Sequence, residues 1–312
     1  MNDRERLLGG LYGLLVGDAV GVPYEFHTPA TLPPWEAIEL PPPPGFRRAH
    51  TRAPAGAWSD DGAQALCLLA SLVERGALDL DDLGRRFVAW RDTGYLAVDG
   101  VVFDVGVQTS TALAALRLGV PALRAGPSGE RQNGNGSLMR VLPLALWHQG
   151  DDRELVHDAA MQSRVTHGHA RSQVCCALYC LWARATLRGS SDAWATATDS
   201  LRRLCRDEPE WSRELEEQIR PEEEAQGAGS GYVVDCLHSA RLALLEPTYE
   251  RVVKYAISLG NDTDTTAAVA GGIAGLRHGL DGIPPRWLTS LNGRGLVDPL
   301  VDRWQADQHP SR

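Results

Sequence analysis

The chain has 312 residues, 43% of them hydrophobic, and a formal net charge of −9. This length and apolar content suffice for a large core, and the acidic balance, with no run of lysine or arginine, argues against duplex nucleic acid as the main partner. The six cysteines include no CxxC pair. They favour reduced core residues over a zinc site, and with the charged N-terminus MNDRERLLGG they predict a cytoplasmic protein.

Apolar residues recur at helical spacing through most of the chain. The pattern i, i+3, i+4, i+7 predicts helices, and no alternating strand hairpins are evident. We therefore expect an all-α protein that forms a single domain over residues 1–312. The predicted helices cover approximately residues 5–21, 60–75, 80–91, 106–118, 137–148, 153–163, 169–187, 193–206, 231–245, 249–259 and 263–278.

The first predicted helix carries glycines four residues apart on one face, at positions 9, 13, 17 and 21. Each glycine costs up to about 1 kcal/mol relative to alanine, so the set indicates close packing against another helix. Gly271 and Gly275 repeat the spacing near the other end of the chain. Because Asp18 interrupts this apolar run and Pro23 closes it, we do not expect it to span a membrane.

Two segments depart from the helical pattern. Residues 30–57 contain seven prolines and predict a long non-helical excursion of a kind that is often functional. Residues 220–231 are acidic and then glycine-rich, which is typical of a mobile surface loop. Neither segment resembles a linker between two independent cores, since similar helices are predicted on both sides.

The stretch WSDDGAQAL places Asp60 and Asp61 side by side at the start of a predicted helix, directly after Ser59. Acids in a first helical turn and a serine N-cap are ordinary features of a helix start. On this stretch alone, helix capping is the simpler interpretation.

A second acidic pair lies far along the chain, in GNDTDTTAAVAGG. Asp262 and Asp264 begin another predicted helix, with Thr265 beside them and no arginine or lysine nearby in the sequence. Helix capping is again the alternative. A buried carboxylate without a partner is costly, however, and two such clusters meeting in space would repel each other. Hard divalent cations, which favour carboxylate and hydroxyl oxygens, would resolve that conflict, and two ions could share the set.

The chain resembles the ADP-ribosylglycohydrolases, which include the dinitrogenase reductase-activating glycohydrolases. The resemblance runs nearly end to end through the ordered motifs GLLVGDAVGVPYEF, WSDDGAQAL, GYLAVDGVVFDVGVQTSTAL, NGNGSLMRVLPLAL, RVTHGHARS, GSGYVVDCLHSA and GNDTDTTAAVAGGIAGL. It implies a compact orthogonal bundle of many helices around a binuclear Mg²⁺ or Mn²⁺ centre. It also implies cleavage of the glycosidic bond between ADP-ribose and a target, most often an arginine side chain.

The resemblance assigns metal ligands to both acidic motifs, with Asp264 as the expected bridge. Three positions depart from the family pattern. Ser59 replaces the usual threonine and keeps its hydroxyl oxygen, and Asn261, where glycine is common, leaves the ligand atoms unaffected. Gly62 stands where threonine is common, and the sequence does not indicate what this changes. The implied ligands are Ser59, Asp60, Asp61, Asp262, Asp264 and Thr265.

Two further carboxylates are candidates for acid and base catalysis. Glu25 ends the glycine-bearing helix, and by itself it reads as a solvated helix-end acid. Asp104 lies between Phe103 and Val105, so it should be paired or functional. The resemblance places Glu25 on a mobile segment next to the metals and Asp104 beside the scissile bond. The sequence does not assign which one is the acid and which the base.

The remaining candidates concern the substrate. NGNGSLMR puts glycines before a helix expected from Ser137, and free amides at a helix start could bind a diphosphate; a plain turn with a cap is the alternative. His167 and His169 have the HxH spacing of a metal pair, but positions i and i+2 do not face each other on a helix. An aromatic residue at a loop edge, such as Tyr232, is more often core, although its ring suits adenine stacking. The substrate-binding residues that the resemblance implies are Gly106, Asn135, Gly136, Ser137, Met139, His167 and Tyr232.

We therefore expect a metal-dependent hydrolase that releases ADP-ribose from an ADP-ribosylated protein or a small ADP-ribose conjugate. One alternative is the same reaction on another linkage: O-linked serine, a nucleobase or a free ADP-ribose compound. The other is a non-catalytic binding or structural protein on the same fold, which would be expected to have broken metal motifs. The sequence does not indicate the oligomeric state.

Overall fold

The computed structural model describes residues 1–308, so the last four residues of the predicted 1–312 domain lie outside the described part. Within the described part, helices and loops make up the chain, and extended pairing is limited to one isolated bridge between Gly134 and Tyr232. The prediction of an all-α protein is confirmed. The α-helices are α1 (Asp3–Gly21), α2 (Asp60–Arg75), α3 (Leu80–Thr93), α4 (Val107–Arg117), α5 (Leu142–Trp147), α6 (Asp152–Arg164), α7 (Ala170–Leu187), α8 (Ala193–Leu204), α9 (Pro209–Arg213), α10 (Val233–Ala243), α11 (Tyr249–Ser258), α12 (Thr263–His278), α13 (Pro285–Ser290) and α14 (Arg294–Gln308).

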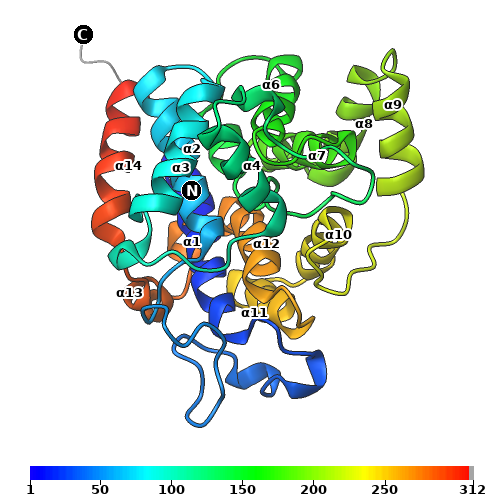
Figure 1. Ribbon diagram of the computed structural model, residues 1–312. Helices are drawn as coiled ribbons and strands as arrows, with labels where there is room; N and C mark the ends of the chain where they lie inside the picture. The colour runs from blue at the N-terminus through cyan, green and yellow to red at the C-terminus, as the bar shows by residue number, and fades with distance from the viewer. Residues whose placement is uncertain (309–312) are drawn as a thin grey trace.

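Helices α1 and α12 run side by side through the middle of the molecule (Figure 1). Their glycines allow the two backbones to touch: a Cβ added at Gly13 would lie 2.4 Å from the carbonyl oxygen of Gly271, and one at Gly9 would lie 2.3 Å from that of Gly275. The predicted close packing is therefore confirmed. Because Gly21 meets the backbone of Asp264 in the same way, this contact brings the end of α1 to the start of α12.

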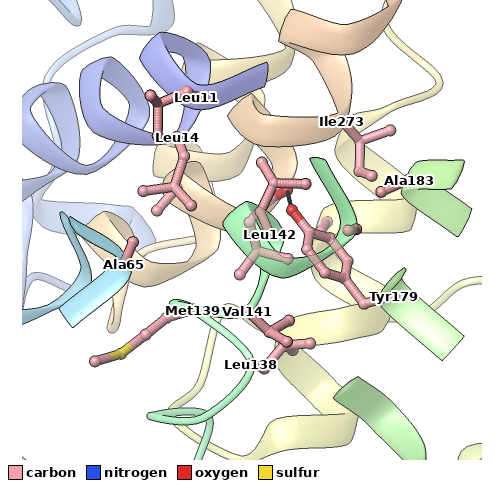
Figure 2. Packing of buried hydrophobic residues seen from close by; sticks show 14 of the residues in the cluster. Leu11, Leu14, Ala65, Leu138, Met139, Val141, Leu142, Tyr179, Ala183 and Ile273 are labelled. Atoms are coloured by element: carbon pink, nitrogen blue, oxygen red, sulfur yellow. Dashed lines mark hydrogen bonds between the residues drawn. The ribbon is translucent and has the colours of Figure 1, made fainter. Parts of the chain in front are cut away.

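The core gathers around this helix pair. Leu11 and Leu14 of α1, Leu142 of α5 and Ile273 of α12 are fully buried (Figure 2). The buried hydroxyl of Tyr179 in α7 donates to the carbonyl oxygen of Val269 at 2.8 Å. All six cysteines are free and buried, as expected for small core residues.

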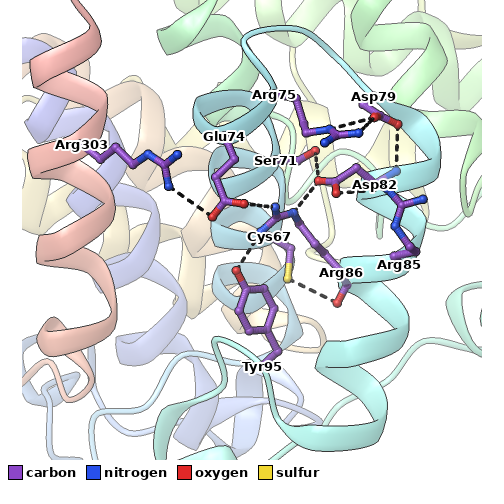
Figure 3. Close-up of polar contacts among 10 residues, drawn as sticks. All are labelled: Cys67, Ser71, Glu74, Arg75, Asp79, Asp82, Arg85, Arg86, Tyr95 and Arg303. Carbon is purple, nitrogen blue, oxygen red and sulfur yellow. Dashed lines mark hydrogen bonds and ion pairs between the residues drawn. The ribbon is translucent and has the colours of Figure 1, made fainter.

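A polar network fixes the far end of α2 (Figure 3). The guanidinium of Arg86 donates to Glu74 of α2 at 2.5 Å and to Asp82 of α3 at 2.6 Å. Glu74 also pairs with Arg303 of α14 at 3.5 Å. Single surface pairs contribute little, but this connected set joins three helices around the element whose other end carries the first acidic motif.

The apolar segment at the N-terminus, residues 3–24, is long and apolar enough to cross a membrane by length and composition. In the folded chain, 89% of its most apolar window is buried among the other helices. Such burial is typical of a core helix in a helical protein.

Two helix predictions were wrong. Residues 137–141 form successive turns, so α5 begins at Leu142 and not at Ser137. The buried guanidinium of Arg140 donates to the carbonyl oxygen of Gly136 and to the side chain of Gln64, which holds these turns in place. Helices α9, α13 and α14 were not predicted: α9 and α13 are too short to show a helical period, with 5 and 6 residues, and Pro299 lies inside α14.

The predicted excursion after the first helix contains only short 3₁₀ turns, and it projects from one end of the molecule (Figure 1). Glu39 ties it to the body by accepting hydrogen bonds from Arg286 and from the indole of Trp287. A salt bridge of 3.2 Å joins Glu39 to Lys254 of α11. The proline-rich segment is therefore a loop that is attached to α11 and α13 through Glu39, and it leads back to the start of α2.

Candidate active site

The two acidic motifs meet. The hydroxyl of Thr265, at the start of α12, donates to the carboxylate of Asp61, at the start of α2, at 3.2 Å. Helix α1 aligns both: the buried carboxylate of Asp18 accepts from the amides of Ser59 and Gly62 at 2.8–3.0 Å. Residues about 200 positions apart therefore form one carboxylate cluster, as the sequence predicted.

The carboxylates of this cluster have no salt-bridge partner within residues 1–308. Asp60, Asp61 and Asp264 are buried, and none of the ion pairs within residues 1–308 reaches them. Burial, and then the charges of neighbouring carboxylates, raise the pKa of each well above its ordinary value. One carboxylate oxygen each of Asp61, Asp262 and Asp264 is buried with no hydrogen-bond partner. Unpaired oxygens of this chemistry fit a hard divalent cation.

Glu25 connects this cluster to a second group. Its carboxylate lies with those of Asp262 and Asp264 in a set whose candidate ligand atoms are within 4.8 Å of one another, and with Asp104 and His50 in another such set. Burial, and then the charge of Asp104, raise the pKa of Glu25 to about 11. Burial, and then the charge of Asp262, raise the pKa of Asp104 to about 6. The two candidate acid and base residues therefore lie beside each other at the metal motifs.

Strained backbone concentrates at this site. Four non-glycine residues that surround it adopt left-handed φ values: Phe26 (62°), His50 (46°), Asp104 (52°) and Asn261 (61°). Such conformations cost of order 1–3 kcal/mol each and persist where the surroundings enforce them. Two backbone hydrogen bonds of 2.7 Å attach the segment after Glu25 to the second acidic motif. The amide of Phe26 donates to the carbonyl oxygen of Asn261, and the amide of Asn261 donates to that of His27.

The segment NGNGSLMR lies next to the carboxylates, although it does not start a helix. The side-chain amide of Asn135 donates to Asp262 at 2.9 Å. The backbone amides of Gly134 and Asn135 are already bonded, to Gln108 and to the carbonyl oxygen of Gly231. The predicted helix N-terminus for a diphosphate is therefore wrong. Within the described chain, the amides of Gly136 and Ser137 remain without a protein acceptor.

Two of the predicted substrate residues direct their side chains into the core. The hydroxyl of Ser137 is fully buried and accepts a hydrogen bond from Ser163 at 2.9 Å. Only the backbone of Ser137 is therefore available to a ligand. Met139 packs among the apolar residues of Figure 2. Gly106, by contrast, is exposed at the start of α4, two residues after Asp104.

His167 is buried beneath the glycines: a Cβ on Gly136 would lie 2.8 Å from its ring. Burial, and then the charge of Arg140, lower its pKa to about 3, so the imidazole is neutral, with Nδ1 bonded to the hydroxyl of Thr166. His169 instead caps α7, where its Nδ1 accepts from the amide of Arg171. Neither histidine lies within a helix: His167 precedes α7, and His169 is its N-cap.

Tyr232 is 39% exposed at the edge of the site, directly opposite Gly134 across the isolated bridge. Its hydroxyl accepts from Arg171 at 3.2 Å, and Arg171 is bonded to the buried Glu214 at 2.7 Å. Glu214 begins a π-helical turn, Glu214–Ile219, of the kind that often marks a functional position. The hydroxyl end of Tyr232 is thus held by the ion pair of Arg171 and Glu214, while the residue stays partly exposed.

A family model described as ADP-ribosylglycohydrolase matches residues 1–311. The chain belongs to the ADP-ribosylglycohydrolase family. Its relatives include the ADP-ribosylarginine hydrolase Tri1 of Pseudomonas putida (strain GB-1), which is 32% identical with coverage of 96% of this chain and 78% of the relative. The ADP-ribosyl-[dinitrogen reductase] glycohydrolase of Rhodospirillum rubrum is 29% identical, with coverage of 92% and 90%.

Human ADP-ribosylhydrolase ARH3 is 28% identical, with coverage of 95% of this chain and 92% of the relative. A solved structure described as an ADP-ribosylglycohydrolase-related protein complex superposes with a TM-score of 0.75 at 31% identity, covering 97% of each chain. Family membership and fold agree, and the chain is an ADP-ribosylglycohydrolase, a hydrolase.

Three residues of this ADP-ribosylglycohydrolase site were not singled out from the sequence. His50 lies in the proline-rich segment, where periodicity gives no signal for a side chain that turns back into a site. Arg171 and Glu214 look like ordinary charged helix residues, and only their burial together behind Tyr232 reveals a role. For His50, the length of the loop was the one available indication.

Proposed function

We propose that this ADP-ribosylglycohydrolase is a divalent-metal-dependent hydrolase that releases ADP-ribose from arginine side chains of modified proteins. The observation that carries the proposal is the meeting of two acidic motifs around three buried, unpartnered carboxylate oxygens. The arginine linkage is supported by the similarity to ADP-ribosylarginine hydrolase Tri1. The six free cysteines favour a reducing, cytoplasmic setting for a single-domain enzyme.

Ser59, Asp60, Asp61, Asp262, Asp264 and Thr265 would hold two ions, Mg²⁺ or Mn²⁺. The residue types support this assignment, since all six offer carboxylate or hydroxyl oxygens. The chemistry that bound cations supply is positive charge that grips the ribose hydroxyls and polarises water. Asn135 and Asp18 support the ligands from behind, one through the side chain of Asp262 and the other through the backbone of the first motif.

Glu25 and Asp104 divide the acid and base roles. One carboxylate accepts a proton from the attacking water, whose oxygen forms the new bond to the anomeric carbon. The other donates a proton to the guanidine nitrogen as the carbon–nitrogen bond breaks, through an oxocarbenium-like transition state. The products are ADP-ribose and unmodified arginine. The proximity of the two carboxylates supports this sharing of roles.

The rest of the ligand would extend from the carboxylates towards Tyr232. The free amides of Gly136 and Ser137 are donors for the diphosphate, and the neutral His167 beneath them shapes the floor. The half-exposed ring of Tyr232 offers a flat face for adenine. Gly106, beside Asp104, would line the acceptor end.

The test is release of label from a mono-ADP-ribosylated arginine protein, with Mg²⁺, with Mn²⁺ and with a chelator. We expect metal-dependent release by the wild type and a loss of at least about 10³-fold in Asp264→Asn, as for removal of a group that stabilises the transition state. Asp298→Asn is a control, since this acid lies on α14, outside both acidic motifs, and accepts a hydrogen bond from the hydroxyl of Tyr12. Release that persists in the chelator or in Asp264→Asn would contradict the proposal.

The same assay with serine-linked ADP-ribose tests the acceptor. Faster release from serine than from arginine would overturn the arginine assignment and leave the hydrolase intact. No release from either substrate, with metal bound, would favour a binding protein on this fold.

A further inference from the structure

His50, in the proline-rich loop, contacts the carboxylate of Glu25 through its side chain. Its Nε2 forms a short hydrogen bond with a carboxylate oxygen of Glu25, and only 13% of the His50 side chain and 4% of the Glu25 side chain are exposed. His167 and His238 bond instead to a hydroxyl and to a backbone carbonyl oxygen. His148 lies 3.7 Å from the carboxylate of Asp158, which is outside the candidate active site.

The loop around His50 is built to deliver this ring. The amide of Ala49 donates to the carbonyl oxygen of Pro23 at 2.8 Å, two residues before Glu25, so the loop is attached at the catalytic segment itself. The amide of Ala53 donates to the carbonyl oxygen of His50 at 2.8 Å and closes a turn. His50 adopts its strained, left-handed backbone within this turn. The strain indicates that the ring's position is enforced.

Two aromatic rings lie beside the imidazole. The ring of Phe103 lies 4.9 Å from that of His50, and the ring of Phe26 lies 5.3 Å from it. Phe103 and Phe26 are the immediate neighbours of Asp104 and Glu25. The imidazole therefore contacts both segments that carry the candidate acid and base. A ring nitrogen of His50 and a carboxylate oxygen from each of Glu25 and Asp104 lie within 4.8 Å of one another.

We propose that His50 is a positioning residue for Glu25: its Nε2–H donates to the carboxylate and holds it at the distance and angle from Asp104 that the reaction requires. The proposal rests on the function proposed above, since it concerns the same bond cleavage. His50 itself touches neither substrate nor the transferred proton. Fixing a carboxylate in this way matters, because a displacement of about 1 Å can cost about 10²-fold in rate.

Kinetics with arginine-linked substrate test this role. We expect His50→Ala to lower kcat by about 10–100-fold while KM changes less than about twofold, since substrate contacts are retained. His50→Gln, whose amide can still donate to Glu25, should recover most of kcat. His157→Ala, an exposed histidine on α6, is the control. An unchanged kcat in folded His50→Ala, or no recovery in His50→Gln, would overturn the proposal.

Calorimetric titration with Mn²⁺ separates positioning from metal ligation. We expect His50→Ala to bind Mn²⁺ with the affinity of the wild type. A loss of more than about tenfold would make His50 a ligand and would overturn the positioning role.

A spectroscopic readout does not depend on turnover. The wild-type protein should show a hydrogen-bonded Nε2–H resonance of an imidazole in ¹H–¹⁵N spectra that is absent from His50→Gln and shifted in Glu25→Gln. If the resonance is absent from the wild type, the His50 proposal is wrong even where hydrolysis is observed. If it is present in a protein that releases no ADP-ribose, the proposed function fails and the contact between His50 and Glu25 stands.

Discussion

Asp18 is a buried carboxylate whose partners are backbone amides. It accepts from Ser59 and Gly62, the residues that flank the acidic pair of the first motif, at 2.8–3.0 Å. Burial raises its pKa to about 7, against the hydrogen bonds from the two amides, which lower it. The side chain thus orients the backbone of the first motif. Loss of a group that orients metal ligands typically lowers the metal affinity about 10–100-fold.

Replacing Asp18 with asparagine should weaken metal binding without removing a ligand. An amide group offers one acceptor oxygen in place of two and removes the negative charge, so the bonds from Oδ1 and Oδ2 to the amides of Ser59 and Gly62 cannot all be kept and those that remain are weaker. We expect a 10–100-fold rise in the Mn²⁺ dissociation constant, measured by calorimetric titration. Asp298→Asn should leave the constant unchanged. A folded Asp18→Asn protein that binds Mn²⁺ within twofold of the wild type would show that these hydrogen bonds do not orient the site.

Individual site residues differ in how far the sequence reveals them. Asp60 and Asp264 could be placed together because each begins a helix with an acid pair and lacks a local cation, so the sequence contains the conflict that a metal resolves. His50 and Arg171 act through contacts with residues 25 and 43 positions away, and nothing in their own neighbourhood records those partners. Asp18 could be flagged as an acid in an apolar helix, but its acceptor role depends on where α2 begins.

At the scale of elements, the contact between α1 and α12 aligns the site. Glycines along both helices let the backbones touch over several turns, so the ends of the two helices are fixed relative to each other. The spacing of these glycines predicted the contact directly. The turns at residues 137–141 could not be predicted in this way, because the burial of Arg140 and its bonds to three separate segments override the local helical pattern.

Gly13→Ala should therefore destabilise the protein by roughly 1–3 kcal/mol or more, since the added methyl meets an immobile backbone carbonyl oxygen 2.4 Å away. Gly295→Ala is the matched control, because a Cβ at that helical position meets no atom within 4 Å. There, alanine should stabilise by up to about 1 kcal/mol. Chemical unfolding measures both. Equal effects at the two positions would mean that the close contact does not limit the helix pair.

At the scale of the whole molecule, the loop of residues 26–57 has to be attached to the rest of the protein at two points for His50 to reach Glu25. One attachment is at the site, through Ala49 and Pro23. The other is remote: Glu39 accepts hydrogen bonds from Arg286 and Trp287 and pairs with Lys254, which lie on α13 and α11. The stability of this remote attachment is therefore part of what keeps the active site assembled.

The attachment depends on pH in a definite direction. Burial opposes the charged form of Glu39, but hydrogen bonds from Arg286, Trp287 and Lys254 outweigh it and lower the pKa to about 2. A lowered folded-state pKa means that the stabilisation is fully present above the unfolded pKa of about 4.3 and is lost as the pH falls towards 2.

Glu39→Gln should thus lower the free energy of unfolding by about 1 kcal/mol at pH 7, a modest value because the group is partly exposed and screened. The difference from the wild type should shrink as denaturant unfolding is repeated at pH 4 and pH 3. At these pH values Glu39 takes up a proton in the unfolded chain, whereas its folded-state pKa of about 2 keeps it largely ionised in the native protein. Glu36→Gln, on the 3₁₀ turn Trp35–Ala37 of the same loop, should show no such convergence. If the difference in free energy of unfolding between Glu39→Gln and the wild type stays constant from pH 7 to pH 3, the ionised carboxylate is not what attaches the loop.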